Sequence, residues 1–183
     1  YVSLLEEVRN ETNRQVKAMC EKLNTILEGE KVGFTLNFER IKKELTKGMV
    51  RERHLAKALR MKVYGICGED KEGIKVMLEK IFGGKSLRAS VENIAEVENE
   101  IRSNLLKAGG RAFVPEDAKA FLSIETICEI VLAAGGIPTY PFLGDDAQGN
   151  YTDFEKDLEC VAEELTKRGF HSVEFITTRN RVD

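Results

Sequence analysis

The chain has 183 residues, of which 42% are hydrophobic and 32% are charged, and its formal net charge is -3. This composition is typical of a soluble globular protein. The slight negative charge gives no basic footprint, so nucleic acid is not indicated as a partner, apart from nucleotides. No apolar run approaches the roughly 18 residues that a membrane span needs. The chain begins at Tyr1 inside a helical pattern, without a signal peptide, and we expect a cytoplasmic piece of a longer protein.

The four cysteines are scattered and form no CxxC pair, which argues against zinc-ribbon and redox motifs. Cys20 and Cys128 lie on apolar helical faces, where we expect buried free thiols in a reducing compartment.

Residues 1–110 have the periodicity of amphipathic helices and predict an all-helical region. The first helix is expected over residues 2–28, with Gly29 as its stop. Further helices are expected from Asn37 to Gly48, over 50–64, over 69–82, and from an N-cap at Ser90 to Gly109.

Residues 111–183 have a different character and predict two βα units. A helix begins near Ser123 and ends at Gly135-Gly136, and it is followed by a strand over 137–140. After a polar, glycine-rich loop come a helix over 153–168 and a strand over 172–177. The strand ends at Tyr140 and Glu174 are expected on one rim, where α/β enzymes place their chemistry. Two or three strands make no stable open sheet by themselves. We expect the rest of the sheet outside this chain; the alternative is that the helical region forms the second layer of the βα part.

Arg51, Arg53 and His54 lie at the first turn of a predicted helix. Arginine forks match phosphate oxygens, and a helix N-terminus adds positive potential, so these residues could bind an anion. The other interpretation is a solvated charged cluster in which Glu52 neutralises one arginine.

Three carboxylates are further candidates. Glu174 lies in an apolar strand, where burial would be costly unless the carboxylate is paired or bound to a metal ion; an exposed strand face would remove that cost. Asp145 and Asp146 in the glycine-rich loop could bind a divalent cation through oxygen ligands, or could simply be solvated.

Three segments resemble motifs of the PHP-domain (polymerase and histidinol phosphatase) family of metal-dependent phosphoesterases. Residues 134–142 resemble a family segment that reads AGG-hydrophobic-P-x-A-H-P, and Gly169 to Glu174 resembles its later glycine and hydrophobic-Glu strand. Residues 51–56 resemble the G-R-P-H-hydrophobic-A motif of the branch with a helical insertion. The motifs occur in the family's order and with its rough spacing.

This resemblance implies a helix-rich α/β protein, namely a partial distorted (β/α)7 barrel (111–183) with an all-helical insertion within 1–110. It implies hydrolysis of phosphate esters with divalent metal ions (Mn, Zn or Fe) that activate water. His54 and Glu174 would be catalytic, and Arg51, Arg53 and His54 would hold the phosphate. The partners would be a small phosphorylated substrate and the remaining part of the barrel.

The chain also departs from the family pattern. Tyr140 occupies the position of a metal-binding histidine, Glu52 replaces the motif arginine, and the opening H-x-H and closing D-x-H motifs do not occur. We therefore expect most metal ligands to lie outside this chain and the isolated chain to be inactive. The alternatives are a metal-free PHP-like pseudoenzyme and a helical binding or regulatory module that docks a partner through residues 2–27.

Overall fold

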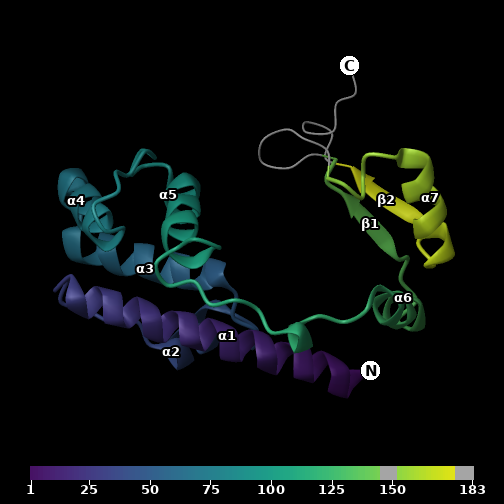
Figure 1. Ribbon diagram of the computed structural model, residues 1–183. Coiled ribbons are helices and arrows are strands. Elements are labelled where there is room, and N and C mark those ends of the chain that lie inside the picture. Colours follow the sequence, from purple (N-terminus) through teal and green to yellow (C-terminus); the bar gives the residue numbers. More distant parts are fainter. Residues whose placement is uncertain (145–151, 176–183) are drawn as a thin grey trace. The chain divides into compact units, whose positions relative to one another are not determined.

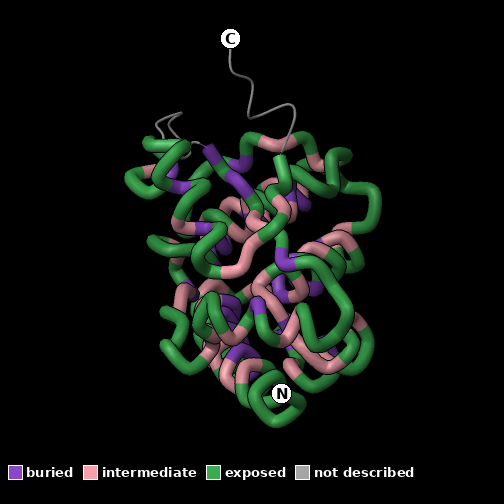
Figure 2. Tube along the Cα trace, turned by 90° about the vertical axis from the view of Figure 1, so that its right-hand side faces the viewer, coloured by how far each residue is buried: buried purple, intermediate pink, exposed green. Residues whose placement is uncertain are grey.

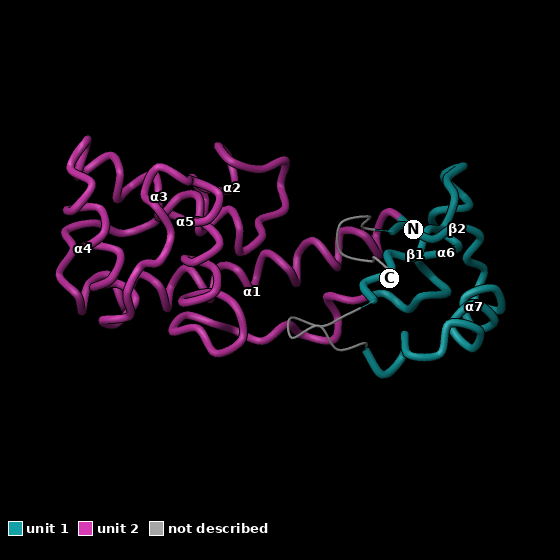
Figure 3. The backbone as a smooth tube through the Cα atoms, turned by 90° about the horizontal axis from the view of Figure 1, so that it is seen from above, with its two compact units in different colours: residues 1, 122–183 teal, residues 2–121 magenta. Residues whose placement is uncertain are grey.

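The computed structural model describes residues 1–144 and 152–175 of the chain. They form two compact units, shown in different colours in Figure 3: residues 2–121, and residues 122–183 together with Tyr1. We call them the helical unit and the βα unit. Asp145 and Asp146, the candidate cation ligands, lie outside the described residues.

The helical unit is built around a long first helix (Figure 1). Its apolar residues come from one face of each amphipathic helix and form a single buried core, seen in purple in Figure 2. The elements are α1 (Val2–Gly29), α2 (Phe38–Leu45), α3 (Glu52–Cys67), α4 (Lys71–Ile81), α5 (Ile94–Ile101), a π-helical turn (Arg102–Leu106) and a 3₁₀ turn (Ala118–Ala120).

Side-chain caps begin most of these helices, as their sequences predict. Asn37 accepts a hydrogen bond from the Arg40 amide at the start of α2. The prediction of Ser90 as the N-cap of α5 was wrong, because Asn93 caps this helix instead. The Tyr64 hydroxyl donates to the Val91 carbonyl at 2.6 Å and holds this residue in a turn before the helix.

Two asparagines of α1 bind the backbone of irregular segments. The Asn13 side chain donates to the Gly48 carbonyl at 2.9 Å and accepts from the Val50 amide at 2.8 Å. About three turns further along the helix, Asn24 donates to the Leu36 carbonyl at 2.9 Å and accepts from the Leu36 amide at 2.8 Å. These bonds satisfy backbone groups that no helix or strand satisfies.

Residues 111–121 belong with the helical unit, although the sequence places the change of character at Arg111. Ala112 is fully buried in the helical core. Gln15 of α1 donates to the Val114 carbonyl at 2.8 Å, and Lys22 donates to the Phe113 carbonyl at 3.0 Å. These hydrogen bonds hold the extended segment against α1.

The βα unit has the predicted order of helix, strand, helix and strand. It consists of α6 (Ile124–Ala133), β1 (Thr139–Phe142), α7 (Leu158–Lys167) and β2 (Ser172–Phe175). The two strands pair in parallel, with Tyr140 opposite Val173 and Pro141 opposite Glu174. Their carboxyl ends therefore share one rim, as predicted. The chain is a helix-rich α/β protein, and its two described strands do not close a barrel.

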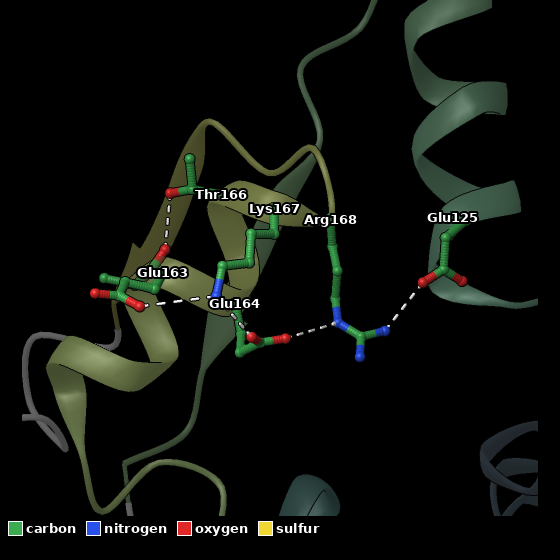
Figure 4. Close-up of polar contacts among 7 residues, drawn as sticks. Glu125, Glu163, Glu164, Thr166, Lys167 and Arg168 are labelled. Atoms are coloured by element: carbon green, nitrogen blue, oxygen red, sulfur yellow. Dashed lines mark hydrogen bonds and ion pairs between the residues drawn. The ribbon is translucent and has the colours of Figure 1, made fainter.

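An ion-pair chain stabilises the end of α7 and joins it to α6 (Figure 4). The Arg168 guanidinium contacts Glu125 of α6 at 3.0 Å and Glu164 at 3.9 Å. Lys167 contacts Glu164 at 3.1 Å. These side chains are largely exposed, so the pairs orient the two helices more than they stabilise the unit.

Cys20 and Cys128 are buried free thiols, as predicted, and burial raises the pKa of the Cys20 thiol to about 11. Among the helices in 1–144 and 152–175, none combines the length and the apolar character that a membrane span requires.

We predict that Asn13→Ala lowers the free energy of unfolding by about 1–3 kcal/mol, because the buried Val50 amide loses its acceptor. Chemical denaturation followed by circular dichroism would measure this loss. Asn10→Ala is the matched control, since Asn10 is exposed on the same helix. An equal effect of the two substitutions would contradict the role assigned to Asn13.

Candidate functional site

The first turn of α3 places Arg51 and His54 in a reciprocal cap. Arg51 is the N-cap residue, and its amide donates to Nδ1 of His54 at 2.9 Å. In return, the His54 amide donates to the Arg51 carbonyl at 2.9 Å. His54 thus occupies the position that glutamate holds in a capping box.

This cap fixes the protonation state of His54. Because Nδ1 accepts a hydrogen bond, the imidazole is neutral and its proton lies on Nε2. Burial lowers the pKa of His54, and the positive charge of Arg53 lowers it further, although Glu52 opposes this shift. Nε2 has no partner within the part of the chain that the structure describes, so it remains a free donor.

Glu52 does neutralise an arginine, but neither of its sequence neighbours. Its carboxylate binds the Arg102 guanidinium of the π-helical turn at 2.8 Å, and both side chains are 28% exposed. Burial raises the pKa of Glu52, but the hydrogen bond and charge of Arg102 outweigh it and leave that pKa lowered. Arg102 is 50 residues away in sequence, so no local pattern indicates this ion pair.

Arg51 and Glu52 line a cleft of about 340 Å³ beside α1. Lys107 and Glu116 add one charge of each sign. Because Glu52 is already paired with Arg102, the lining retains a positive excess around Arg51. Arg53 is exposed and does not line this cleft. The other lining residues are Thr12, Gln15, Val16, Met19, Leu106, Ala108 and Phe113.

We predict that His54→Ala lowers the free energy of unfolding by about 1 kcal/mol at pH 7, whereas His54→Glu preserves the cap. The folded state lowers the pKa of His54 below 6.5, so acid favours the unfolded chain. The contribution of His54 is therefore present above pH 6.5 and is lost as the pH falls from there through the folded-state pKa.

Thermal denaturation of both variants between pH 7.5 and about 5 would test this cap. The parent protein should lose stability over this range more steeply than His54→Glu. Parallel curves for the two would refute the assignment of Nδ1 as the acceptor.

A second cluster lies after β1 and centres on a buried carboxylate. Glu155 is only 2% exposed. Its Oε1 accepts from the Tyr140 hydroxyl and the Leu143 amide, both at 3.0 Å. Its Oε2 accepts from the Gly144 amide at 3.1 Å and from the Thr152 hydroxyl at 2.7 Å. Two donors therefore bind each oxygen.

These hydrogen bonds determine the protonation states of Glu155 and Tyr140. Burial raises the pKa of Glu155, but the donors of Thr152, Leu143, Tyr140 and Gly144 outweigh it, so the pKa is lowered and Glu155 is a carboxylate. Burial and the adjacent carboxylate raise the pKa of Tyr140 to about 12. At neutral pH Tyr140 is a phenol that donates its proton to Glu155.

Glu155 was missed by the sequence analysis because the second helix was expected from residue 153. That start was wrong: Asp157 caps α7, which begins at Leu158. The preceding residues form a turn in which Thr152 accepts from the Glu155 amide at 3.2 Å. The Thr-x-x-Glu spacing of 152–155 was a signal of this turn, since it is the spacing of a capping box.

Glu174 is exposed, and it lies opposite Pro141 in the parallel pair. Glu174 therefore carries no free-energy cost of a buried carboxylate, and its catalytic role remains a prediction. His54 and Glu174 belong to different units of the chain.

We predict that the βα unit loses stability as the pH falls below 4.5, the ordinary pKa of a glutamate. The folded-state pKa of Glu155 lies lower, so its contribution is present above 4.5 and disappears as the pH falls through the folded-state value. Glu155→Gln should flatten this dependence and cost about 1–3 kcal/mol at pH 7, because the new NH2 group then faces two of the four donors while the remaining oxygen still accepts from the other two.

Amide hydrogen exchange of Leu143 and Gly144 would measure this effect locally. Glu159→Gln is the matched control, because Glu159 is exposed on α7. Unchanged protection in Glu155→Gln would contradict the proposed anchoring.

The described residues contain no cluster of three or more His, Cys, Asp or Glu side chains that could hold a metal ion. Comparisons of the chain with protein-family models, with curated proteins and with solved structures found no match.

Proposed function

We propose that this chain is part of a PHP-like protein that binds phosphate esters, with the helical unit as the insertion and the βα unit as two units of the barrel. The observation that carries the proposal is the parallel pairing of β1 with β2, which puts Tyr140 and Glu174 near one rim. That is the arrangement that the resemblance of residues 134–142 and 169–174 implies. In the full-length protein the family resemblance favours a phosphoesterase.

Tyr140 and Glu155, as the structure describes them, do not fit a metal ion. Tyr140 stands where the family has a metal-binding histidine, yet its hydroxyl is protonated and donates to Glu155. Both oxygens of Glu155 already accept two hydrogen bonds. Divalent ions (Mn, Zn or Fe) would need other ligands, so we derive no hydrolytic step from this rim. This observation favours the metal-free, PHP-like binding protein among the alternatives.

Phosphate binding is assigned to the first turn of α3. Arg51 lines the cleft, and its guanidinium has no carboxylate partner in the described part of the chain. The cap holds the imidazole of His54 as a neutral donor through Nε2. His54 does not itself line the cleft, so a phosphate at this turn would receive charge-assisted hydrogen bonds from Arg51 and would reach Nε2 of His54 from outside the cleft lining. Arg53 is exposed beside them and would add positive potential.

The helical docking module draws limited support from α1. Leu5 is 45% exposed and Val2 is 73% exposed, but Val16, Leu23 and Leu27 are buried in the core of the unit. Docking through α1 would therefore be restricted to its first turns.

We predict that Arg51→Ala weakens the binding of a phosphate ester such as phosphoserine about tenfold or more in the full-length protein, because a charged hydrogen-bond donor is removed. Isothermal titration calorimetry would measure the affinity. His54→Glu keeps the cap but replaces the Nε2 donor by a carboxylate, and it should weaken binding as well. Arg9→Ala on the exposed side of α1 is the control.

Elemental analysis and a phosphatase assay with and without manganese decide between the two forms of the proposal. Bound metal with metal-dependent turnover would support the phosphoesterase, and phosphate affinity without metal or turnover would support the binding protein. Unchanged phosphate affinity in Arg51→Ala and His54→Glu would overturn both.

A further inference from the structure

The face between α2 and α3 contains an apolar groove that phosphate binding does not use. Its volume is about 440 Å³. Ile41 and Ala58 line it with only 5% and 8% of their surface exposed. Met61 and Ile66 also line it, with 48% and 52% exposed. Exposed apolar side chains that border a hollow provide a surface for another apolar group.

Gly65 gives this groove an open wall. It lies within α3 and lines the groove, and a Cβ added there would meet nothing within 4 Å. Its φ is not in the left-handed region, so the backbone does not require glycine. Glycine weakens a helix relative to alanine. Its advantage here is that another backbone can approach α3 closely.

The surroundings of the groove are positively charged. Residues 38–67 contain nine Lys and Arg but only three Asp and Glu. Two of these carboxylates are already paired, Glu44 with Arg40 at 2.8 Å and Glu52 with Arg102, and one of the cations, Arg60, is paired with Glu98 at 3.0 Å. Lys62 lines the groove and has no carboxylate partner among the described residues, and neither does Lys57, one helical turn before Met61.

We propose that the α2–α3 groove binds an acidic amphipathic helix of a partner protein. Such a helix would place apolar anchors at i, i+3 or i+4, and i+7 in the groove and direct its carboxylates to the lysines. The lining residues of α3 extend from Ala58 to Ile66, which is about 12 Å or two turns of helix. This length matches three such anchors.

Charge and shape together distinguish this partner from other anionic ones. Nucleic acid would pair its phosphates with the lysines but would leave the apolar floor of Ile41 and Ala58 without contacts. An anionic membrane would cover the exposed Met61 and Ile66 but would not fill a hollow. The proposal does not depend on the phosphate site, since neither Arg51 nor His54 lines this groove.

Fluorescence anisotropy with the complete protein would test the proposal. The probe is a fluorescein-labelled peptide of about 15 residues, with leucines at i, i+3, i+4 and i+7 and glutamates on its other face. A second peptide carries lysines in place of the glutamates. We expect the acidic peptide to bind at least about tenfold more tightly, and its affinity to fall as the salt concentration rises.

Variants in the groove should weaken this binding. Gly65→Leu fills the open wall without loss of helix propensity, and Ile66→Glu places a like charge in the groove; each should cost about tenfold or more in affinity. Val76→Glu is the matched control for Ile66→Glu, because Val76 is 54% exposed on α4 and outside the groove. Circular dichroism verifies that each variant is folded.

Three results would overturn the proposal. They are equal affinities for the acidic and the basic peptide, unchanged affinity in folded Gly65→Leu, and binding to phosphatidylserine vesicles or duplex DNA without binding of the acidic peptide.

Discussion

The helical unit depends on the side-chain amides of α1, which satisfy the backbone of segments without regular structure. Asn13 binds both Gly48 and Val50, and Asn24 binds both backbone groups of Leu36. Asn13 is 8% exposed and Val50 is fully buried, so water cannot replace this bond. The loss of such a partner leaves a buried polar group unsatisfied, which costs more than an ordinary hydrogen bond contributes.

The position of the candidate phosphate site follows from this constraint. Val50 directly precedes Arg51, so the bond from the Val50 amide to Asn13 fixes the chain just before the N-cap of α3. The cap then orients His54, and Glu52 is held by Arg102. The Arg51 guanidinium and Nε2 of His54 are left for an external anion, with Arg53 exposed beside them. Because this backbone is already ordered, the protein loses less conformational entropy when an anion binds.

In the βα unit, one buried carboxylate binds backbone amides in a similar way. Glu155 binds two successive backbone amides after β1, together with the hydroxyls of Tyr140 and Thr152. A buried carboxylate is tolerated only when donors replace its hydration, and four donors do so here. The Tyr140 hydroxyl of β1 is one of these donors. The two units also differ in net charge. Residues 2–121 contain 23 Lys and Arg and 19 Asp and Glu, whereas residues 122–183 contain five Lys and Arg and twelve Asp and Glu.

The sequence by itself determined the elements whose signals are local. Helical periodicity, the caps at Asn37 and Ser123, and the order of strands and helices after residue 122 all depend on residues within a few positions of one another. The parallel pairing of β1 with β2 also followed, because a helix between two strands allows that connection. Only the tertiary structure decided the contacts between distant residues. The Tyr64 hydroxyl binds the turn before α5, Arg102 lowers the pKa of Glu52, and the Tyr140 hydroxyl of β1 binds the buried Glu155. Each arises where a side chain from another element meets a backbone or a charge, and no local pattern encodes that meeting.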